Sequence, residues 1–348
     1  MAYFFKLPAI TELTIAQQAA LNEPNAIAIS GGPGTGKSVV SLWRHIRNYG
    51  TGSKKSLLLT YTKTLEAYLS SSAKSESEKA PSDIEKKRIL ESSKNVDRTY
   101  NWLHNHKKHY AEIIVDEAQD VKLSNYTELN DYADAVSYGA DTEQSVFLTN
   151  DELKELESGL KSLFKNENHF LDENFRNSTE IIRFVKALFI NRKMPLGNLN
   201  GPRPILLISN GNNQKEQTAI LDIINQFKSD SHNIAILLPL RADVERYFQF
   251  LNGKVNCSMY YEGLPFTGIE NVHITTFKSS KGTEFDTVII PEFQNMLNNI
   301  ARLRVIEEND YYVAITRTRR NLYLLSSATP NFLERSEQQK LTYSKELL

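Results

Sequence analysis

A glycine-rich stretch near the start of the chain has the residues needed to bind phosphate. Residues 31–38 read Gly-Gly-Pro-Gly-Thr-Gly-Lys-Ser, directly after the apolar run 26–29. Two glycines with four residues between them, followed by Lys and Ser, form the P-loop pattern. Glycines let backbone N–H groups approach a phosphate without Cβ obstruction, and the helix expected over 39–48 adds its dipole. Lys37 would then reach the β- and γ-phosphates, and the Ser38 hydroxyl would hold Mg²⁺.

The context of this loop favours a nucleotide site over a flexible turn without a ligand. An apolar strand precedes the loop and a helical stretch follows it, as the pattern requires. The sequence therefore predicts that the protein binds a nucleoside triphosphate. The loop residues expected to contact the triphosphate are Gly32, Pro33, Gly34, Thr35, Gly36, Lys37 and Ser38.

A cluster of acidic residues follows a second apolar strand. The strand covers 112–115, and residues 116–120 read Asp-Glu-Ala-Gln-Asp. Ligands gather at the carboxyl ends of parallel strands, so we expect Asp116 at the same sheet edge as the P-loop. Asp116 would hold Mg²⁺ through a water, and Glu117 would activate the attacking water as general base. Alone the cluster could be an exposed turn; together with the P-loop it indicates triphosphate hydrolysis.

Short apolar runs alternate with amphipathic helical segments along the chain, which is typical of parallel sheets with helices on both faces. Ten strands suit two sheets better than one, so we predict two tandem α/β domains, residues 1–167 and 168–348. The expected strands are 26–30, 56–60, 112–115, 135–138, 169–171, 204–208, 233–238, 272–275, 287–290 and 321–326. The expected helices are 39–48, 151–164, 179–190, 215–227 and 242–251.

Composition limits the class of protein. The 41 Lys and Arg residues nearly balance 42 Asp and Glu, so any nucleic-acid binding must come from a local groove rather than a global field. A single cysteine excludes a disulfide framework and fits a reducing compartment. The start of the chain lacks a signal-peptide pattern, and no run of about eighteen apolar residues occurs. We therefore expect a cytoplasmic protein with no membrane partner.

One segment breaks the alternation of strands and helices. Residues 70–94 are rich in Ser, Glu and Lys, with few large apolar side chains and Pro81 in the middle. We expect this segment to loop out as a mobile or short helical insertion. A solvated charge run and a docking surface for a partner both remain open interpretations.

With these residues, the chain resembles superfamily 1 helicases of the UvrD/PcrA/Rep type. The stretch 116–120 is similar to the family's second motif, and further motifs follow in the family's order over nearly the whole chain. The resemblance implies two tandem RecA-like P-loop domains with parallel sheets, in which insertion domains are absent or rudimentary. It also implies ATP and Mg²⁺ as cofactors and a single strand of DNA, or RNA, as partner.

The resemblance implies roles for residues that surround the P-loop in the first domain. The stretch 13–21 resembles the Q motif, in which Gln17 would read the adenine edge. The stretch 139–144 resembles motif III, in which Gln144 would sense the γ-phosphate. Lys37, Asp116 and Glu117 keep the roles already assigned to them.

The second domain would complete the nucleotide site with positive charge. Residues 174–176 resemble motif IV, in which Phe175 would stack on the base and Arg176 would touch the γ-phosphate. Residues 276–285 resemble motif V, with Gly282 at the nucleotide and Glu284 on the ribose. Residues 312–317 resemble motif VI, with Arg317 as the second arginine finger. A finger of this kind contributes on the order of 10³–10⁵ in rate.

Strand-contact residues are implied at fewer matching positions. Thr60 and Tyr61 fall in a stretch similar to motif Ia, Thr99 in one similar to motif Ib, and Thr276 at the start of motif V. The family's stacking tryptophan after motif III is missing, and Phe147 is the candidate substitute. Motif V also departs from the family at 278, where Lys replaces the usual histidine, and at 283, where Thr replaces leucine.

We expect an ATP-dependent translocase or helicase of the 3′ to 5′ type on single-stranded DNA. The stretch 99–112 is too short for the family's insertion domain, so a partner would have to supply the wedge for processive unwinding. The alternative is a DNA-stimulated ATPase switch that controls a partner nuclease or effector. A small-molecule kinase would leave Gln144, Arg176 and 312–317 unexplained. A metal site at His104, His106 and His109 is a weaker interpretation, because no Cys or paired carboxylate accompanies them.

Overall fold

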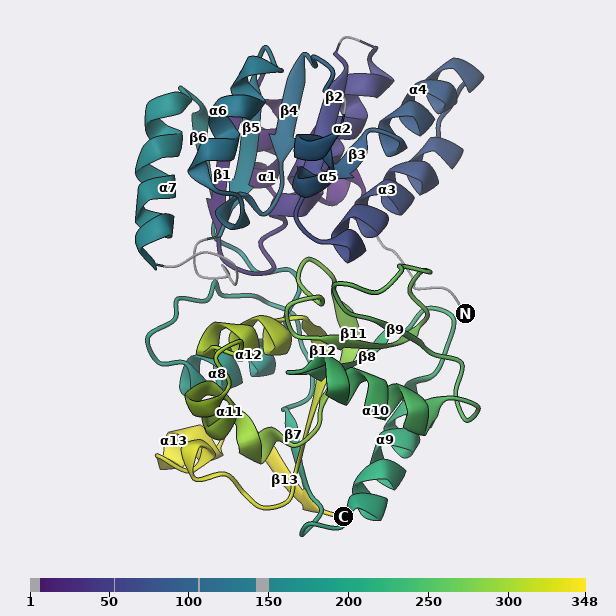
Figure 1. Cartoon of the computed structure of the whole chain (residues 1–348), viewed down its shortest axis with the longest axis vertical. Coiled ribbons are helices and arrows are strands. Elements are labelled where there is room, and N and C mark those ends of the chain that lie inside the picture. Colours follow the sequence, from purple (N-terminus) through teal and green to yellow (C-terminus); the bar gives the residue numbers. More distant parts are fainter. Residues whose placement is uncertain (1–6, 53, 106, 142–149) are drawn as a thin grey trace. The chain divides into compact units, whose positions relative to one another are not determined.

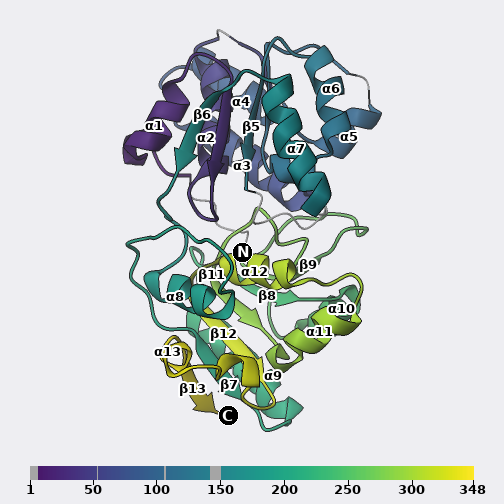
Figure 2. The ribbon, with the colours of Figure 1, turned by 90° about the vertical axis from the view of Figure 1, so that its left-hand side faces the viewer.

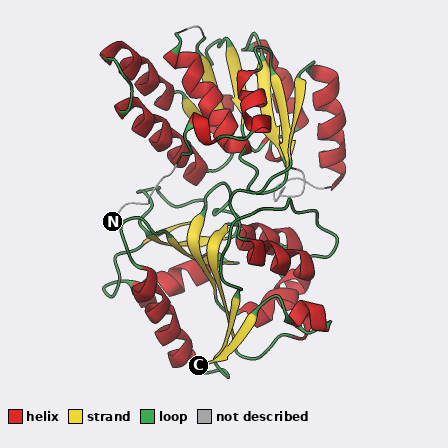
Figure 3. Ribbon diagram, turned by 180° about the vertical axis from the view of Figure 1, so that it is seen from behind, coloured by secondary structure: helices red, strands yellow, loops and turns green. Residues whose placement is uncertain are grey.

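The computed structural model describes residues 7–52, 54–105, 107–141 and 150–348, which form two compact units (Figure 1). The described part of the first unit ends at Glu173, and the second unit contains Asn174–Leu348. Each unit holds one fully parallel sheet flanked by helices (Figure 3), so the predicted fold of two parallel-sheet α/β domains is confirmed. Among the described residues, no helix is long and apolar enough to cross a membrane.

The N-terminal sheet has six strands in the order β3-β2-β4-β5-β1-β6. All five positions of β2 are buried, as expected for an inner strand covered by helices on both faces. The strands are β1 (Ile27–Gly31), β2 (Ser56–Thr60), β3 (Val96–Arg98), β4 (Glu112–Val115), β5 (Val136–Ala140) and β6 (Glu167–Leu171). The helices are α1 (Ile15–Asn22), α2 (Lys37–Gly50), α3 (Lys63–Glu78), α4 (Asp83–Ser93), α5 (Thr99–His104), α6 (Leu123–Asp131) and α7 (Asn150–Leu163), with 3₁₀ turns η1 (Ile10–Glu12) and η2 (Ala118–Asp120).

The polar segment 70–94 forms the greater part of a helical hairpin, α3 and α4, whose helices pack against each other and against α2. The predicted insertion is therefore helical, although it packs against α2 rather than looping out. Its helix starts are capped: the hydroxyl of Thr62 accepts from Leu65 N, and that of Ser82 accepts from Glu85 N. Within residues 70–94 the buried face consists mainly of small side chains such as Ser72 and Ala73, together with Ile89. The larger buried side chains of Leu65, Tyr68 and Leu69 precede this segment on α3.

Strand β6 belongs to the first sheet, although the sequence analysis places residues 168–173 in the second domain. It pairs in parallel with β1, with Ile27 opposite Glu167 and Gly31 opposite Leu171. Four of its five residues are exposed or partly exposed, because β6 is an edge strand. The polar stretch at 165–168 therefore leads into this strand and forms its first two residues.

The C-terminal sheet has seven strands in the order β13-β7-β12-β11-β8-β10-β9. Helices α9 and α10 lie on one side of it, and α8, α12 and α13 on the other (Figures 1 and 2). The strands are β7 (Ile205–Ile208), β8 (Ile234–Leu238), β9 (Ser258–Tyr260), β10 (Val272–Thr276), β11 (Phe285–Ile290), β12 (Thr318–Ser326) and β13 (Ser344–Leu347). The helices are α8 (Thr179–Leu188), α9 (Asn213–Phe227), α10 (Arg241–Leu251), α11 (Met296–Arg302), α12 (Glu308–Thr316) and α13 (Glu337–Lys340), with 3₁₀ turns η4 (Phe293–Asn295) and η5 (Asn331–Leu333).

The two sheets share one strand order. Apart from the extra edge strand β9, the order β10-β8-β11-β12-β7-β13 repeats β3-β2-β4-β5-β1-β6 position by position. Both β4 and β11 lead into a glutamate with left-handed backbone, Glu117 (φ 57°) and Glu292 (φ 54°), followed by a 3₁₀ turn. However, Asp116 precedes the first glutamate and Pro291 the second. The second unit thus repeats the fold without the acidic pair.

A buried ion pair joins helix α2 to strand β4. Arg44 Nε donates to Glu112 Oε1 at 2.7 Å, and both side chains are buried. The same carboxylate accepts from Asn48 Nδ2 at 2.8 Å and from the hydroxyl of Ser137 on β5 at 2.5 Å. All of these partners satisfy a charge that would otherwise be costly to bury. The network therefore fixes α2 against the two strands next to it.

Two buried histidines should make each unit sensitive to acid. Burial lowers the pKa of His45 to about 4 and that of His273 to about 3, from about 6.5 in the unfolded chain. Below about pH 6.5 the unfolded chain binds protons that the folded histidines do not, so stability falls as the pH falls. Each histidine should lower the free energy of unfolding by up to about 1.4 kcal/mol for each unit by which the pH falls below about 6.5.

Urea unfolding measured at several pH values between about 6.5 and about 4.5 tests this prediction. His45→Gln and His273→Gln should each make the dependence of the unfolding free energy on pH less steep than in the wild type. An unchanged slope in either variant would contradict the assignment for that histidine, whatever the absolute stability of the variant.

Candidate functional site

The P-loop lies between β1 and α2 and is shaped by glycines in left-handed backbone. Gly34 has φ 73° and Gly36, which caps α2, has φ 85°. A Cβ added at Gly36 would lie 2.5 Å from Gln17 Nε2, and one at Gly31 would lie 2.4 Å from the carbonyl oxygen of Leu171. Close approach of the main chain to its neighbours therefore requires glycine at both positions.

Lys37 extends back along its own loop. Its ammonium donates to the carbonyls of Gly31 at 2.7 Å and Gly32 at 2.9 Å. The same nitrogen lies 3.6 Å from Oδ2 of Asp141, a buried carboxylate directly after β5. Asp141 was not among the residues predicted from the sequence. Its position right after a strand, like that of Asp116, is the signal that could have identified it.

Asp116 and Ser38 lie together at the end of β4, as predicted for a pair that holds Mg²⁺. The Asp116 carboxylate is buried, and Oδ2 has no hydrogen-bond partner among the described residues. Burial and the nearby Glu117 raise the pKa of Asp116 to about 7, against a hydrogen bond from Ser38 and the charge of Lys37. A buried carboxylate with an unsatisfied oxygen next to a hydroxyl fits the oxygen ligands that Mg²⁺ prefers.

Gln119 connects the acidic turn to the segment after β5. Its side chain is fully buried; Nε2 donates to Glu117 Oε2, and Oε1 accepts from the backbone N–H of Asp141 at 2.9 Å. Glu117 itself is held in left-handed backbone. Sequence reasoning missed Gln119, because the contact joins two turns that are about twenty residues apart in the chain. The amide thus orients the glutamate predicted to act as base.

Gln17 braces the P-loop from helix α1. Its Nε2 donates to the Thr35 carbonyl at 2.9 Å, and its Oε1 accepts from Thr14 N at 3.0 Å. The side chain is buried. Both the amide nitrogen and the amide oxygen of Gln17 therefore bond to the protein. In this structure Gln17 supports the P-loop, whereas the resemblance implies that it reads the adenine edge.

In the C-terminal unit, a carboxylate and several arginines gather at the amino end of β11 and β12. Arg176 Nε donates to Glu284 Oε2 at 2.9 Å, and Arg319 Nη1 lies 3.7 Å from Glu284 Oε1. Burial opposes ionisation of Glu284, but the guanidinium groups of Arg176, Arg319 and Arg317 outweigh it and lower its pKa. Arg319 was not predicted from the sequence.

Arg317 is fully buried at the end of α12. Its Nε donates to the Val313 carbonyl at 3.1 Å, and Nη1 donates to the Thr283 carbonyl at 3.4 Å. Phe175, by contrast, is exposed over 42% of its surface, and Gly282 has left-handed backbone with φ 82°. The predicted residues of this unit thus fall in one neighbourhood, with different degrees of access to solvent.

The threonines predicted to contact a nucleic-acid strand are buried. Thr60 is the last residue of β2 and Thr99 the first residue of α5, and the Thr99 hydroxyl donates to the Thr60 carbonyl at 3.4 Å. The Thr276 hydroxyl accepts from Ser279 N at 3.2 Å and shapes the turn after β10. Tyr61 is partly exposed. Gln144 and Phe147, also predicted, lie outside the described residues.

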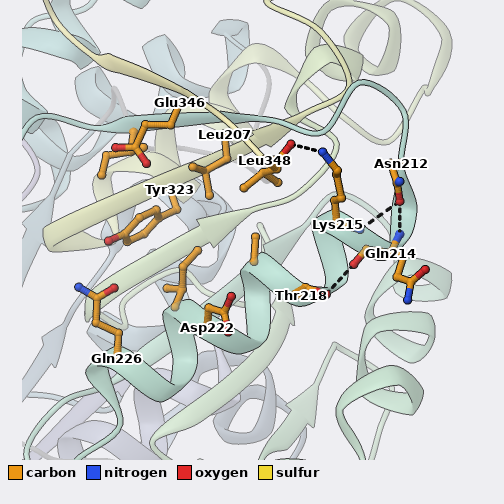
Figure 4. A pocket seen from close by; sticks show the side chains of 13 residues that line it. Leu207, Asn212, Gln214, Lys215, Thr218, Asp222, Gln226, Tyr323, Glu346 and Leu348 are labelled. Atoms are coloured by element: carbon orange, nitrogen blue, oxygen red, sulfur yellow. Dashed lines mark hydrogen bonds between the residues drawn. The ribbon is translucent and has the colours of Figure 1, made fainter.

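A cavity of about 690 Å³ opens in the C-terminal unit between α9 and strands β7, β12 and β13 (Figure 4). It is lined by apolar side chains such as Leu207, by the ring of Tyr323 and by the charged side chains of Lys215, Asp222 and Glu346. None of the residues predicted from the sequence lines it. The cavity is therefore separate from the arginine cluster.

Two protein families match the chain. Residues 24–200, just over half of the chain, match the family described as Schlafen group 3, DNA/RNA helicase domain. Residues 257–329 match the UvrD-like helicase C-terminal domain. The RecBCD enzyme subunit RecB of Chlamydia pneumoniae is 40% identical over 68 residues, which are 20% of this chain and 6% of RecB. The chain thus matches only a small part of that relative.

Solved structures show a similar fold. S. cerevisiae Dbp5 bound to RNA and ADP BeF3 matches with a TM-score of 0.56 at 12% identity, over 96% of this chain and 90% of that chain. The C-terminal domain of a possible DNA helicase from Lactobacillus plantarum matches 49% of this chain and 98% of its own, at 19% identity and a TM-score of 0.36. At this identity, the likeness to Dbp5 concerns the fold alone.

Replacing Gly36 by alanine should lower the free energy of unfolding for two reasons, the left-handed backbone and the short distance to Gln17. Gly36→Ala should lower the free energy of unfolding by the left-handed strain, about 1–2 kcal/mol, plus a steric term of about 1–3 kcal/mol. Gly253 is the matched control, because it has φ 82° against 85° but no atom within 4 Å of its added Cβ. Urea unfolding should show a larger loss for Gly36→Ala than for Gly253→Ala. Equal losses would contradict the predicted clash.

Proposed function

Because the chain belongs to the family described as Schlafen group 3, DNA/RNA helicase domain, and its residues 257–329 match the UvrD-like helicase C-terminal domain, we propose that it is a Mg²⁺–ATP-dependent translocase or helicase. In this proposal it moves 3′ to 5′ on single-stranded DNA. The observation that carries the proposal is the buried Asp116 carboxylate, with one oxygen unsatisfied, beside Ser38 and close to Lys37. These are the side chains that a triphosphate and its metal ion require.

In this proposal the N-terminal unit binds the nucleotide. Backbone N–H groups of the P-loop and the start of α2 hold the phosphates, while Lys37 exchanges its carbonyl partners for phosphate oxygens. Ser38 and Asp116 would hold Mg²⁺, which when bound neutralises charge on the phosphates. Asp141 lies close enough to Lys37 to help hold the ammonium in place.

Glu117 would accept the proton of the water that attacks the γ-phosphorus, while the bond from that phosphorus to the leaving ADP oxygen breaks. Its carboxylate is oriented by the hydrogen bond from Gln119, and Gln119 in turn is held by the N–H of Asp141. A base fixed in this way loses little rotational freedom when it reacts. General bases of this kind contribute about 10²–10⁴ in rate.

The C-terminal unit would contribute positive charge to the developing charge on the γ-phosphoryl group. Arg176 and Arg317 are the proposed fingers, since the second sheet has no P-loop and Pro291 where the first has Asp116. Hydrolysis would then require both units, and binding and release of nucleotide would change how they engage each other. Such a two-state cycle can be converted into steps along a strand.

The short connections in the described chain favour a second candidate function. Only seven residues separate the end of α5 at His104 from the start of β4 at Glu112, which leaves no room for an inserted domain. The alternative is therefore a DNA-stimulated ATPase that switches a partner nuclease or effector without unwinding DNA itself. The 68-residue match to a RecBCD subunit is compatible with such a role in a complex.

ATP turnover with and without single-stranded DNA, measured alongside displacement of 3′-tailed and 5′-tailed duplexes, separates these functions. Stimulated turnover with displacement of the 3′-tailed duplex alone supports the helicase. Stimulation without displacement supports the switch. Stimulation of turnover by single-stranded RNA and not by single-stranded DNA would show that RNA is the nucleic acid on which the protein acts. No turnover under any of these conditions would overturn both.

Substitutions in the acidic turn should separate binding from hydrolysis. Glu117→Gln should reduce kcat by about 10²-fold or more while nucleotide still binds, because only the proton acceptor is lost. Lys37→Ala should abolish both binding and turnover, since the cation at the phosphates is lost. Steady-state turnover and binding of a fluorescent ATP analogue provide the two measurements.

Glu292→Gln is the matched control, because Glu292 occupies the equivalent turn of the second sheet and has the same left-handed backbone. Its turnover should equal that of the wild type. If Glu117→Gln turned over ATP as fast as this control, Glu117 would not be the base.

A further inference from the structure

The resemblance assigns Arg176 and Glu284 to opposite ends of ATP, but the structure holds them in one ion pair. Resting on the proposed function, we propose that Glu284 is a positioning residue for Arg176 rather than a ribose contact. The carboxylate accepts from Nε–H of Arg176, and no other described residue bonds the Nη groups, which we assign to the terminal phosphate. Arg319 holds the same carboxylate from the neighbouring strand.

The geometry of the Arg176 contact carries the first part of this proposal. Its Nε donates to Glu284 Oε2 at 2.9 Å, and these side chains are exposed by only 17% and 22%. A guanidinium is planar with donors in fixed directions, so one bond at Nε sets the orientation of the remaining four N–H groups. An arginine finger that is already oriented loses less conformational entropy when it binds the phosphate.

The main chain beside Arg176 is also fixed. The backbone N–H of Arg176 donates to Asn174 Oδ1 at 2.9 Å, and that oxygen also accepts from Asn177 N at 2.8 Å. Asn177 Nδ2 donates to the carbonyls of Thr316 and Thr318, on either side of Arg317. The turn that carries Arg176 is therefore tied to the segment that carries the second proposed finger.

Strand pairing brings Arg319 to the other side of the carboxylate. Glu284 directly precedes β11, whose first residue, Phe285, lies opposite Thr318 of β12. Arg319 follows Thr318, and its Nη1 lies 3.7 Å from Glu284 Oε1. The arginines around Glu284 lower its pKa in spite of burial, so the carboxylate is ionised at neutral pH.

The energies of the competing contacts favour the positioning role. A hydrogen bond between a guanidinium and a carboxylate is roughly twice as strong as one between neutral groups. A neutral ribose hydroxyl that took Oε2 would replace the Arg176 contact and leave a partly buried guanidinium without its carboxylate. Breaking a desolvated charge pair costs more free energy than the new hydrogen bond to the hydroxyl returns.

Deoxynucleotides separate the two roles directly. Turnover of ATP, 2′-deoxy-ATP and 3′-deoxy-ATP is measured for wild type and Glu284→Gln at saturating single-stranded DNA. We expect kcat to fall by about tenfold with all three nucleotides, with KM changed less than about twofold, because an oriented finger is lost and no ribose contact is involved. A loss with ATP that disappears with either deoxynucleotide would overturn the proposal.

A double-substitution cycle tests whether Glu284 acts through Arg176. Arg176→Gln should cost more than tenfold in kcat, and adding Glu284→Gln to it should cost nothing further. Losses that multiply would overturn the proposal. Arg319→Gln should reduce kcat by about threefold, and the exposed neighbour Arg320 supplies the control variant Arg320→Gln, which should match the wild type.

Two further measurements keep the outcome decisive. Glu284→Asp keeps the charge but shortens the side chain, so its kcat should lie between those of the wild type and Glu284→Gln. This variant replaces Glu284→Gln in the test if Glu284→Gln folds poorly. If the wild type hydrolyses no ATP, the proposed function fails. The ion pair is then tested by the free energy of unfolding in urea, measured for the same two single variants and the double variant. Absence of coupling between Arg176 and Glu284 there would overturn the positioning role on its own.

Discussion

The buried ion pair between Arg44 and Glu112 is the contact on which the phosphate site depends. Helix α2 begins at the P-loop and β4 ends at the acidic turn, so a fixed helix and strand fix the distance between Lys37 and Asp116. Losing one partner of such a pair costs about 3–5 kcal/mol, because a charge is left buried without compensation. The chemistry at one edge of the sheet is thus anchored at the opposite end of the same strand.

The equivalence of the two sheets explains how one fold can serve two tasks. After β4 the chain places Asp116 and Glu117, whereas after β11 it places Pro291 and Glu292, and Glu292 is neutralised by Arg246 at 2.8 Å. The second unit instead concentrates arginines at the amino end of its strands. A common scaffold therefore carries the acidic pair of the proposed metal site in one copy and a cluster of arginines in the other, according to a few residues at strand ends.

The sequence predicted the elements whose signal is local. Strands β2 and β4 were predicted to the residue, because each is a continuous apolar run with polar boundaries. Strands β3, β9 and β13 were missed, since each has three or four residues and includes polar ones. The helices α3 and α4 were predicted only as a mobile or short helical insertion, because the segment 70–94 contains few large apolar side chains. Gln119 and Arg319 acquire their meaning only from contacts between segments far apart in the chain, which no local pattern records.

The close approach of Gly31 to Leu171 has a mechanical consequence. No side chain separates the first residue of the phosphate loop from the carbonyl of the edge strand, so neither can yield by changing a rotamer. Leu171 lies three residues before Asn174, where the second unit begins. A side chain at residue 31 would therefore have to displace the main chain of β6 itself, three residues before the second unit begins.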